Sequence, residues 1–211
     1  MYQHFEYKDY NPDTITKFIA DFPFAVISGC DLKYNPVATQ APVFLEEQDG
    51  KKLLRGHMIK GSEHHKAFTE NNRVMVLFPG PDTYVSATWY SGKQSASTWN
   101  YMTVQAKGTI RFPGEEQLIE ILRKTTLHFE NNNGLSPTTF DNLGPEYTQR
   151  LLHAITAFEV EVHDLDHVFK LSQDMDEESF ENIIKELKNG NAAAQSIAGE
   201  MEKRKQRLFD K

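Results

Sequence analysis

The stretch YVSATWYSGKQSASTWNYMTVQAKG, from Tyr84 to Gly108, decides which folds are possible. It carries both tryptophans of the chain, Trp89 and Trp99, on two segments rich in the aromatic and β-branched residues typical of strands. A small, polar, glycine-containing loop separates the two segments. Flat aromatic surface bordered by hydroxyls and an amide predicts either a packed core or a contact surface for a flat ligand, and the spacing alone leaves both open.

The composition is that of a globular protein. Of the 211 residues, 39% are hydrophobic and 25% are charged, which is ordinary for a folded domain. No stretch approaches the ~20 apolar residues that a membrane-spanning helix needs. The first five residues, MYQHF, lack the basic and apolar segments of a signal peptide, and the single Cys30 cannot form an internal disulfide. We therefore expect a cytoplasmic protein.

The charge balance argues against broad nucleic-acid binding. Thirty acidic and 23 basic residues give a net charge of −7, whereas binding to phosphates relies on an excess of Lys and Arg. One basic cluster, KRKQR at residues 203–207, lies near the C-terminus. We interpret this cluster as a solvated helix end, where cations are favourable, rather than as a nucleic-acid-binding arm.

Turn and capping residues divide the chain into elements. Asn11-Pro12-Asp13 predicts a helix start, Asp49-Gly50 a hairpin turn, and Asp176 the cap of a helix that ends at Asn189-Gly190. Periodicity predicts strands over residues 24–28, 37–46, 51–59, 73–78, 84–90, 98–112 and 157–162, and Pro79-Gly80-Pro81 is expected to end the fourth of them. Helices are predicted to begin at residues 12, 115 and 177, to span residues 62–71 and 145–155, and to include the Ala-rich remainder of the chain. The long strand over 98–112 needs a bulge or bend, for which Gly108 is the candidate.

About seven strands with few helices between them predict a mainly antiparallel α+β barrel with peripheral helices and C-terminal helices. Closing such a sheet removes the exposed edges that short strands otherwise present. We expect residues 1–175 to form the barrel domain and residues 176–211 to form a C-terminal helical extension packed on it.

One segment has the chemistry of a phosphate site. From Arg55 to Lys66 a strand ends near a cationic residue, passes a glycine and starts a helix with a serine cap, Ser62. Free N–H groups at a helix N-terminus, together with a hydroxyl and a nearby lysine, can bind a phosphate. An ordinary capped helix explains the same pattern. Beside the aromatic strands, a phosphate site would suit a flat, phosphorylated cofactor.

Other chemistry has little support. The sequence contains no Gly-x-Gly-x-x-Gly, no phosphate-loop motif and no His-Glu-x-x-His. His163 and His167 have a spacing that could bind a metal on a helix, but we interpret this segment as a strand end and turn. The adjacent His64 and His65 would point about 100° apart on a helix, which makes them poor joint ligands.

Several motifs then resemble the PaiB-like FMN-binding proteins over nearly the whole chain, from Phe5 to about Leu187. Residues 35–42, NPVATQAP, are similar to the family's Pro-x-Ala-Thr-His-Leu-Pro, and residues 56–62, GHMIKGS, to its Gly-His-Met-Ala-Arg-Ala-Asn. Residues 169–173, FKLSQ, are similar to its Lys-Phe-Lys-Leu-Ser-Gln-Asn. Further matches are FPGP at 78–81, YVS at 84–86, WY at 89–90 and TWNY at 98–101.

The resemblance implies an FMN-binding split β-barrel, related to the pyridoxamine-phosphate-oxidase-like flavoproteins and usually a homodimer with flavin at the subunit interface. It implies Lys60 and Ser62 at the phosphate, and His57, Met58 and Ile59 beside the ribityl chain or ring. It also implies Trp99, Asn100 and Tyr101 bordering the flavin ring, with Thr39, Lys170 and Gln173 as weaker candidates that reach across the dimer.

The chain departs from the family pattern around the expected phosphate site. Lys60 replaces an arginine, Ser62 an asparagine and Glu63 a proline, while Gln40 and Asp82 replace histidines. Lysine keeps the charge but loses the bidentate fork of arginine. Ala87 and Ser97 stand in place of prolines, and Asp174 in place of an asparagine.

Three functions fit this sequence. The first is a flavin-dependent redox protein, in which the cofactor carries the chemistry and no catalytic acid or base is identified. The second is a non-catalytic sensor of flavin or its redox state, since founding members of the family are described as negative transcriptional regulators. The third is a cofactor-free split-barrel interaction module.

Overall fold

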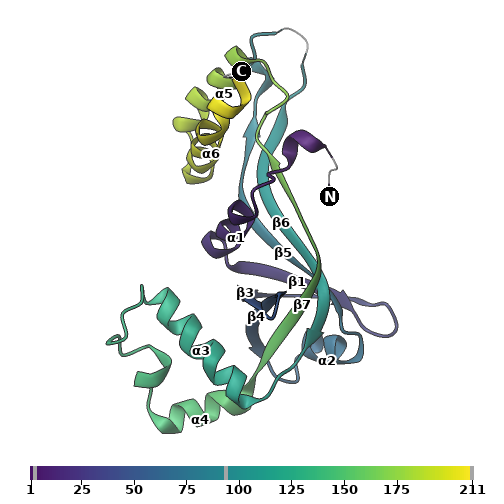
Figure 1. The fold of residues 1–211 in the computed structure, drawn as a ribbon, viewed down its shortest axis with the longest axis vertical. Coiled ribbons are helices and arrows are strands. Elements are labelled where there is room, and N and C mark those ends of the chain that lie inside the picture. The colour runs from purple at the N-terminus through teal and green to yellow at the C-terminus, as the bar shows by residue number, and fades with distance from the viewer. Residues whose placement is uncertain (2–3, 93–94, 210–211) are drawn as a thin grey trace. The chain divides into compact units, whose positions relative to one another are not determined.

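The computed structural model describes residues 1, 4–92 and 95–209 (Figure 1). The predicted loop between the tryptophans includes Lys93 and Gln94, which lie outside the described residues, as do Tyr2, Gln3 and the last two residues. The elements in chain order are η1 (Phe5–Tyr7), α1 (Pro12–Asp21), β1 (Phe24–Cys30), β2 (Pro36–Pro42), β3 (Phe44–Gln48), β4 (Lys51–Ile59), α2 (Glu63–Glu70), β5 (Arg73–Val85), η2 (Ala87–Trp89), β6 (Thr98–Arg111), α3 (Glu115–Phe129), η3 (Phe140–Asn142), α4 (Pro145–Ala154), β7 (Ile155–Lys170), α5 (Glu177–Lys188) and α6 (Ala192–Phe209).

The seven described strands form one curled sheet in the order β2-β1-β5-β6-β7-β4-β3. The pairs β1–β2, β1–β5, β3–β4 and β4–β7 are antiparallel. The first and last strands of this order, β2 and β3, are consecutive in the chain and are separated only by Val43, which is fully buried. The sheet therefore curls until its two edges meet at one residue, which confirms the predicted α+β split barrel with peripheral helices.

The chain forms two compact units. One contains residues 19–78 and 105–165, and the other contains residues 1–18, 79–104 and 166–211. Each of the strands β5, β6 and β7 contributes residues to both units. The predicted division into residues 1–175 and 176–211 stays a prediction.

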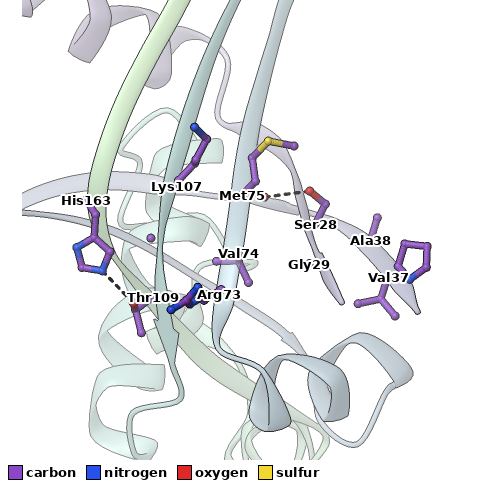
Figure 2. Close-up of a pocket in the computed structure, with 12 residues that line it drawn as sticks. Ser28, Gly29, Val37, Ala38, Arg73, Val74, Met75, Lys107, Thr109 and His163 are labelled. Atoms are coloured by element: carbon purple, nitrogen blue, oxygen red, sulfur yellow. Dashed lines mark hydrogen bonds between the residues drawn. The ribbon is translucent and has the colours of Figure 1, made fainter. Parts of the chain in front are cut away.

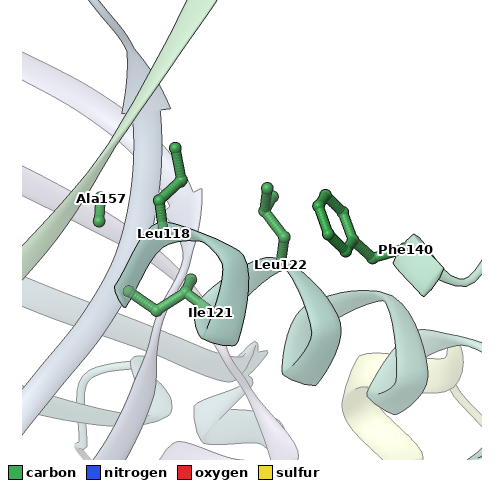
Figure 3. Packing of buried hydrophobic residues seen from close by; sticks show 5 residues of the cluster. All are labelled: Leu118, Ile121, Leu122, Phe140 and Ala157. Carbon is green, nitrogen blue, oxygen red and sulfur yellow. The ribbon is translucent and has the colours of Figure 1, made fainter. Parts of the chain in front are cut away.

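The unit of residues 19–78 and 105–165 has an apolar core inside the curled strands. Ile27, Leu54 and Phe158 come from three strands, Phe68 comes from α2, and all four are fully buried. Outside the strands, Leu118, Ile121 and Leu122 lie along one face of α3, and pack with Phe140 and Ala157 in a second cluster (Figure 3). The helical period predicted from residue 115 therefore marks the face of α3 that covers the sheet.

The unit that contains the C-terminus is organised by α5 and α6, which lie side by side (Figure 1). Asp176 caps α5 by accepting a hydrogen bond from the Ser179 N–H at 2.9 Å, as predicted. Phe180 and Ile183 of α5 and Ile197 and Met201 of α6 are fully buried. The Ala-rich segment thus packs through a narrow apolar stripe.

The predicted single strand over residues 37–46 is wrong, because it is two strands, β2 and β3. The chain crosses from one edge of the sheet to the other at Val43, whose N–H donates to the carbonyl of Pro23 at 2.8 Å instead of joining a strand ladder. Apolar periodicity continues through this crossing, so the pattern could not locate the break.

The predicted end of a strand at Phe78 is also wrong, because β5 continues through Pro79-Gly80-Pro81 to Val85. The pairing of β5 with β1 ends at Leu77, so Pro79 removes no hydrogen bond from that ladder. The predicted strand over residues 84–90 is wrong beyond Val85, since Ala87–Trp89 is a 3-10 turn.

The predicted strand end and turn at His163–His167 is wrong, because β7 runs from Ile155 to Lys170. Four residues along a strand span about 13 Å, which is too far for two histidines to bind one metal ion. Residues 1, 4–92 and 95–209 contain no group of three or more His, Cys, Asp or Glu side chains that could hold a metal.

Gly108 does not interrupt β6, because buried and more exposed residues alternate without a break from Asn100 to Arg111. A bulge would shift this alternation by one residue. A Cβ on Gly108 would lie 2.2 Å from the carbonyl oxygen of Glu161. Gly108 therefore permits the close approach of β7 rather than an inserted residue.

Gly56→Ala tests the closure of the sheet. A Cβ at this position would lie 2.6 Å from both the carbonyl oxygen of Pro42 and the ring of Phe158. We expect a loss of stability of about 1–3 kcal/mol in urea unfolding, because the backbone of β2 cannot move without opening the edge. Gly199→Ala, inside α6 with nothing within 4 Å, is the control and is expected to stabilise by up to about 1 kcal/mol. Equal effects of the two changes would contradict the tight closure.

Stability should fall on mild acidification because of His167. This buried ring accepts a hydrogen bond from the Asp9 N–H through Nε2 at 2.7 Å, and burial followed by the nearby charge of Lys8 lowers its pKa, against the opposing effects of Asp166 and Asp9. The unfolded chain therefore binds more protons between the lowered pKa and the ordinary value of about 6.5, so stability is lost as the pH falls through this window.

His167→Gln keeps an acceptor but does not titrate, so we expect a shallower decrease of the urea midpoint between pH 7 and about pH 5.5. His153→Gln, at an exposed histidine of α4, is the matched control. An unchanged slope in His167→Gln would show that this imidazole is not responsible.

Candidate functional site

The turn from β4 into α2, residues 57–65, is the predicted phosphate site, and we call it the β4–α2 corner. Gly61 has a φ of 76°, which favours glycine. The Ser62 hydroxyl accepts from the His65 N–H at 3.3 Å and donates to the Ile59 carbonyl at 2.9 Å. The Gly61 N–H donates to His65 Nδ1 at 3.2 Å. The predicted capped helix is confirmed, and its own hydrogen bonds hold the corner in shape.

The first turn of α2 leaves donors open to a ligand. In the part of the chain that the structure describes, no hydrogen bond is made by the N–H groups of Glu63 and His64. These groups and the helix dipole attract anions, and the exposed Lys60 adds a positive charge. Glu63 opposes this attraction. Burial lowers the pKa of His64 and His65, so both rings are neutral at pH 7 and add no charge.

His57 places a polar atom without a partner at this corner. Its Nδ1 is buried and has no hydrogen-bond partner within residues 4–92 and 95–209. The cross-strand neighbour of His57 is Ala157, which belongs to the apolar cluster under α3 (Figure 3). Burial in these surroundings lowers the pKa of His57, so the ring is neutral at pH 7. An unpaired buried nitrogen costs about 1–3 kcal/mol, which a ligand hydrogen bond would recover.

Strand alternation separates the predicted residues of β4. His57 and Ile59 share one face of the strand, and Ile59 is 66% exposed. Met58 points to the opposite face and is buried in the core. Thr39 of β2 lies opposite the fully buried Ile27 and shares its face of the sheet. Strand alternation therefore places His57 and Ile59 on one face of β4, just before Lys60 and Ser62 in the chain, and directs Met58 and Thr39 inward.

The other predicted residues belong to the unit of residues 1–18, 79–104 and 166–211. Trp99 is 53% exposed and meets Tyr84 edge-on, with ring centroids 6.2 Å apart. Tyr101 follows on the same face of β6, whereas Asn100 faces the core. Asn100 is fully buried, accepts from the Ser172 hydroxyl at 3.1 Å and places Nδ2 3.6 Å from Met201 Sδ.

Lys170 and Gln173 lie at the end of β7 in the same unit. The Lys170 ammonium donates to the Thr98 hydroxyl at 2.5 Å, which brings it to the strand that carries Trp99. The Gln173 side chain accepts from the Leu171 N–H at 2.6 Å and donates to the Phe169 carbonyl at 2.5 Å. Gln173 thus stabilises its own turn. Lys170 is the positively charged residue among the predicted site residues of this unit.

Two features of the site regions were missed in the sequence. The Tyr90 hydroxyl is buried without a partner within the described residues, and burial, then the nearby Asp174 and Tyr84, raises its pKa. Glu159, in the predicted strand over residues 157–162, is 2% exposed and binds both Arg55 and Arg111. The only sequence signal for this buried carboxylate was the opposite charge of Arg55 and Arg111 on the two strands that flank β7.

Asn100→Ala separates a structural role from a ligand-binding one. The change leaves the buried Ser172 hydroxyl without its acceptor, so we expect a loss of about 1–3 kcal/mol in urea unfolding. Trp99→Ala, on the exposed face of the same strand, is the matched control and should cost no more than about 1 kcal/mol, the value of its aromatic pair with Tyr84. A larger loss for Trp99→Ala than for Asn100→Ala would contradict this assignment.

Comparison with known proteins places this fold and corner in a family. Residues 1–164 match the family described as "Putative FMN-binding domain". "Protease synthase and sporulation protein PAI 2" of Bacillus subtilis is 29% identical over 203 residues, which cover 96% of this chain and 97% of that protein.

Two solved structures share the fold. One is the FAD and heme binding protein of Mycobacterium smegmatis (TM-score 0.57, 16% identity, 77% of this chain and 72% of that one). The other is the flavocytochrome Anf3 of Azotobacter vinelandii (TM-score 0.55, 16% identity, 80% of this chain and 72% of that one). The protein is thus a split-barrel protein of the flavin-binding class. More narrowly, the chain belongs to the PaiB-like FMN-binding family, and FMN is its cofactor.

The residues of the β4–α2 corner fit FMN. The open N–H groups and Lys60 suit a phosphate, and the buried Nδ1 of His57 lacks the hydrogen bond that a polar cofactor can supply. Separately, no described helix is both long and apolar enough to cross a membrane.

Proposed function

We propose that this protein is a flavin-dependent redox protein that holds FMN at the β4–α2 corner. The observation that carries the proposal is the orphan Nδ1 of His57 on a strand that leads directly into Lys60 and an open helix N-terminus. When bound, FMN supplies hydride acceptance and electron transfer at its ring.

The chain's own residues then have separate tasks. Lys60 and the N–H groups of Glu63 and His64 bind the phosphate. The Ser62 hydroxyl donates its hydrogen bond to the Ile59 carbonyl, so Ser62 stabilises the conformation of the corner rather than donating to the phosphate. His57, neutral at pH 7, exchanges a hydrogen bond with the ribityl chain or ring, and the exposed side chain of Ile59 covers it from water. The roles of Trp99, Tyr101 and Lys170 stay predictions from the family resemblance.

Opposite changes of charge at the corner should shift FMN affinity in opposite directions. We expect Lys60→Ala to raise the Kd about tenfold, the worth of one charge-assisted hydrogen bond, and Glu63→Gln to lower it about threefold by removing a repulsive charge. Lys66→Ala, at an exposed lysine of α2, is the matched control and should leave the Kd unchanged. The Kd for FMN of the wild type and the three variants is measured by the quenching of flavin fluorescence.

Riboflavin, which lacks the phosphate, distinguishes the phosphate contacts from the ring contacts. Its affinity should be the same in wild type, Lys60→Ala and Glu63→Gln, and should fall in His57→Leu. The placement of the phosphate at this corner would be wrong if Lys60→Ala lowered the affinity for riboflavin as much as the affinity for FMN. It would also be wrong if Lys60→Ala changed neither affinity.

We also propose that the protein is a homodimer in the cytoplasm. Phe24 and Ile59, 55% and 66% exposed in one chain, support a surface that a second copy covers. Light scattering should give about twice the 24.2 kDa of one chain, and a mass of 24.2 kDa would exclude the dimer. The lone Cys30 is compatible with a reducing compartment.

A regulatory flavin sensor is the second candidate, favoured by the 29% identity to PAI 2, whose name connects it to protease synthesis and sporulation. The net charge of −7 makes direct DNA contact unfavourable. Oxidation of NADH or NADPH by the FMN-loaded protein, beyond that of free FMN, would favour the redox enzyme. Its absence, together with salt-sensitive DNA retention, would favour the regulator.

A further inference from the structure

A second pocket lies in the unit of residues 19–78 and 105–165, away from the β4–α2 corner. It has a volume of about 920 Å³, which is within the range of small-molecule sites. Strands β1, β2, β5, β6 and β7 line it, and none of the predicted cofactor residues does (Figure 2). The pocket therefore belongs to a different part of the sheet from the proposed FMN site.

One wall of this pocket is apolar. Ala38 of β2 and Met75 of β5 contribute side chains to it, since both lie opposite Ser28 of β1 and share its face of the sheet (Figure 2). The backbone of Gly29 continues this wall between the two side chains. This surface suits a flat apolar or aromatic group.

The opposite end carries a positive charge without a counterion. The Arg73 guanidinium is exposed and has no hydrogen-bond or ion-pair partner within residues 4–92 and 95–209. Lys107 is paired with Asp164 at 2.9 Å. No carboxylate lines the pocket. Arg73 is thus the cation available to a ligand.

Hydroxyl and imidazole groups lie next to this arginine. Thr109 Oγ1 and His163 Nε2 are 2.8 Å apart, and the Ile110 N–H donates to the Asn72 carbonyl, which holds Thr109 beside the start of β5 (Figure 2). A planar guanidinium beside a hydroxyl is a strong recognition pair for a carboxylate, because it binds both oxygens.

We propose that this pocket binds a small organic acid with a flat apolar body, its carboxylate on Arg73 and Thr109 and its body against Ala38 and Met75. The pocket is open, so affinity is modest, with a Kd on the order of 10–100 µM for a ligand of about 15–20 heavy atoms. Binding here is independent of FMN, since no residue is shared.

The probe is 2-naphthoate, measured by calorimetry on the full chain with saturating FMN, so that the flavin site is not available to it. Wild type should bind saturably, and Arg73→Gln should weaken binding at least tenfold. Arg150→Gln, an exposed arginine on α4, is the matched control and should bind like wild type. The neutral 2-naphthamide should bind at least tenfold more weakly than the acid.

Ala38→Glu gives a second test that does not depend on Arg73. Ala38 is exposed, so the fold tolerates the change, and the new carboxylate repels an acid from the apolar wall. Loss of naphthoate binding with unchanged FMN affinity supports the proposal. Equal binding by wild type, Arg73→Gln and Ala38→Glu would overturn it. The proposal would also be overturned if the wild type showed no saturable binding and formed a dimer that Ala38→Glu dissociates. That result would assign this face to self-association.

Discussion

The passage of the chain from β2 into β3 through the single residue Val43 is the constraint on which the barrel depends. Because β2 and β3 are the two ends of the strand order, this step requires the sheet to curl until its ends meet. The contact is possible because Gly56 of β4 has no side chain where the Pro42 carbonyl and the Phe158 ring approach. Gly56 immediately precedes His57, so the residue that permits closure also fixes where the β4–α2 corner begins.

Strand alternation then decides which predicted residues can act together. On β4 it places His57 and Ile59 on one face and Met58 in the core, and on β6 it places Trp99 and Tyr101 on one face and Asn100 in the core. In the proposed function, Lys60 and the open N–H groups of α2 attract the phosphate, and the acidic Glu63 in the first turn of the helix opposes them. At the proposed FMN site, the negative charge of Glu63 therefore works against the positive charge of Lys60.

Much of the fold was predictable where local chemistry marks an element. Ser62 and Asp176 cap their helices as predicted, and Asp49 and Gly50, with φ of 52° and 73°, form the predicted hairpin turn. Strand ends were less predictable, because they depend on partners far along the chain. Val43 breaks a continuous apolar pattern only because two sheet edges meet there, and Pro79 lies within β5 only because its pairing with β1 has already ended.

The local shape of the candidate site was predictable, but the burial of its side chains was not. The motif from Gly56 to Ser62 predicted a strand that turns into a capped helix. The sequence pattern did not predict that His57 Nδ1 is buried without a partner, or that Glu159 is buried between two arginines. Both depend on α3 and on cross-strand neighbours. The unpaired Arg73 was equally hidden, since an exposed arginine at a strand start is ordinary in a sequence.

The most direct measurement is the nitrogen NMR spectrum of protein labelled with ¹⁵N-histidine, with and without FMN, with His57 assigned by its loss in His57→Asn. We expect the His57 Nδ1 resonance of the neutral ring to shift on saturation with FMN, because the nitrogen gains a hydrogen-bond partner, while the resonances of His153 on α4 do not shift. FMN that binds with saturation and leaves the His57 resonance unchanged would contradict the placement of the cofactor at the β4–α2 corner.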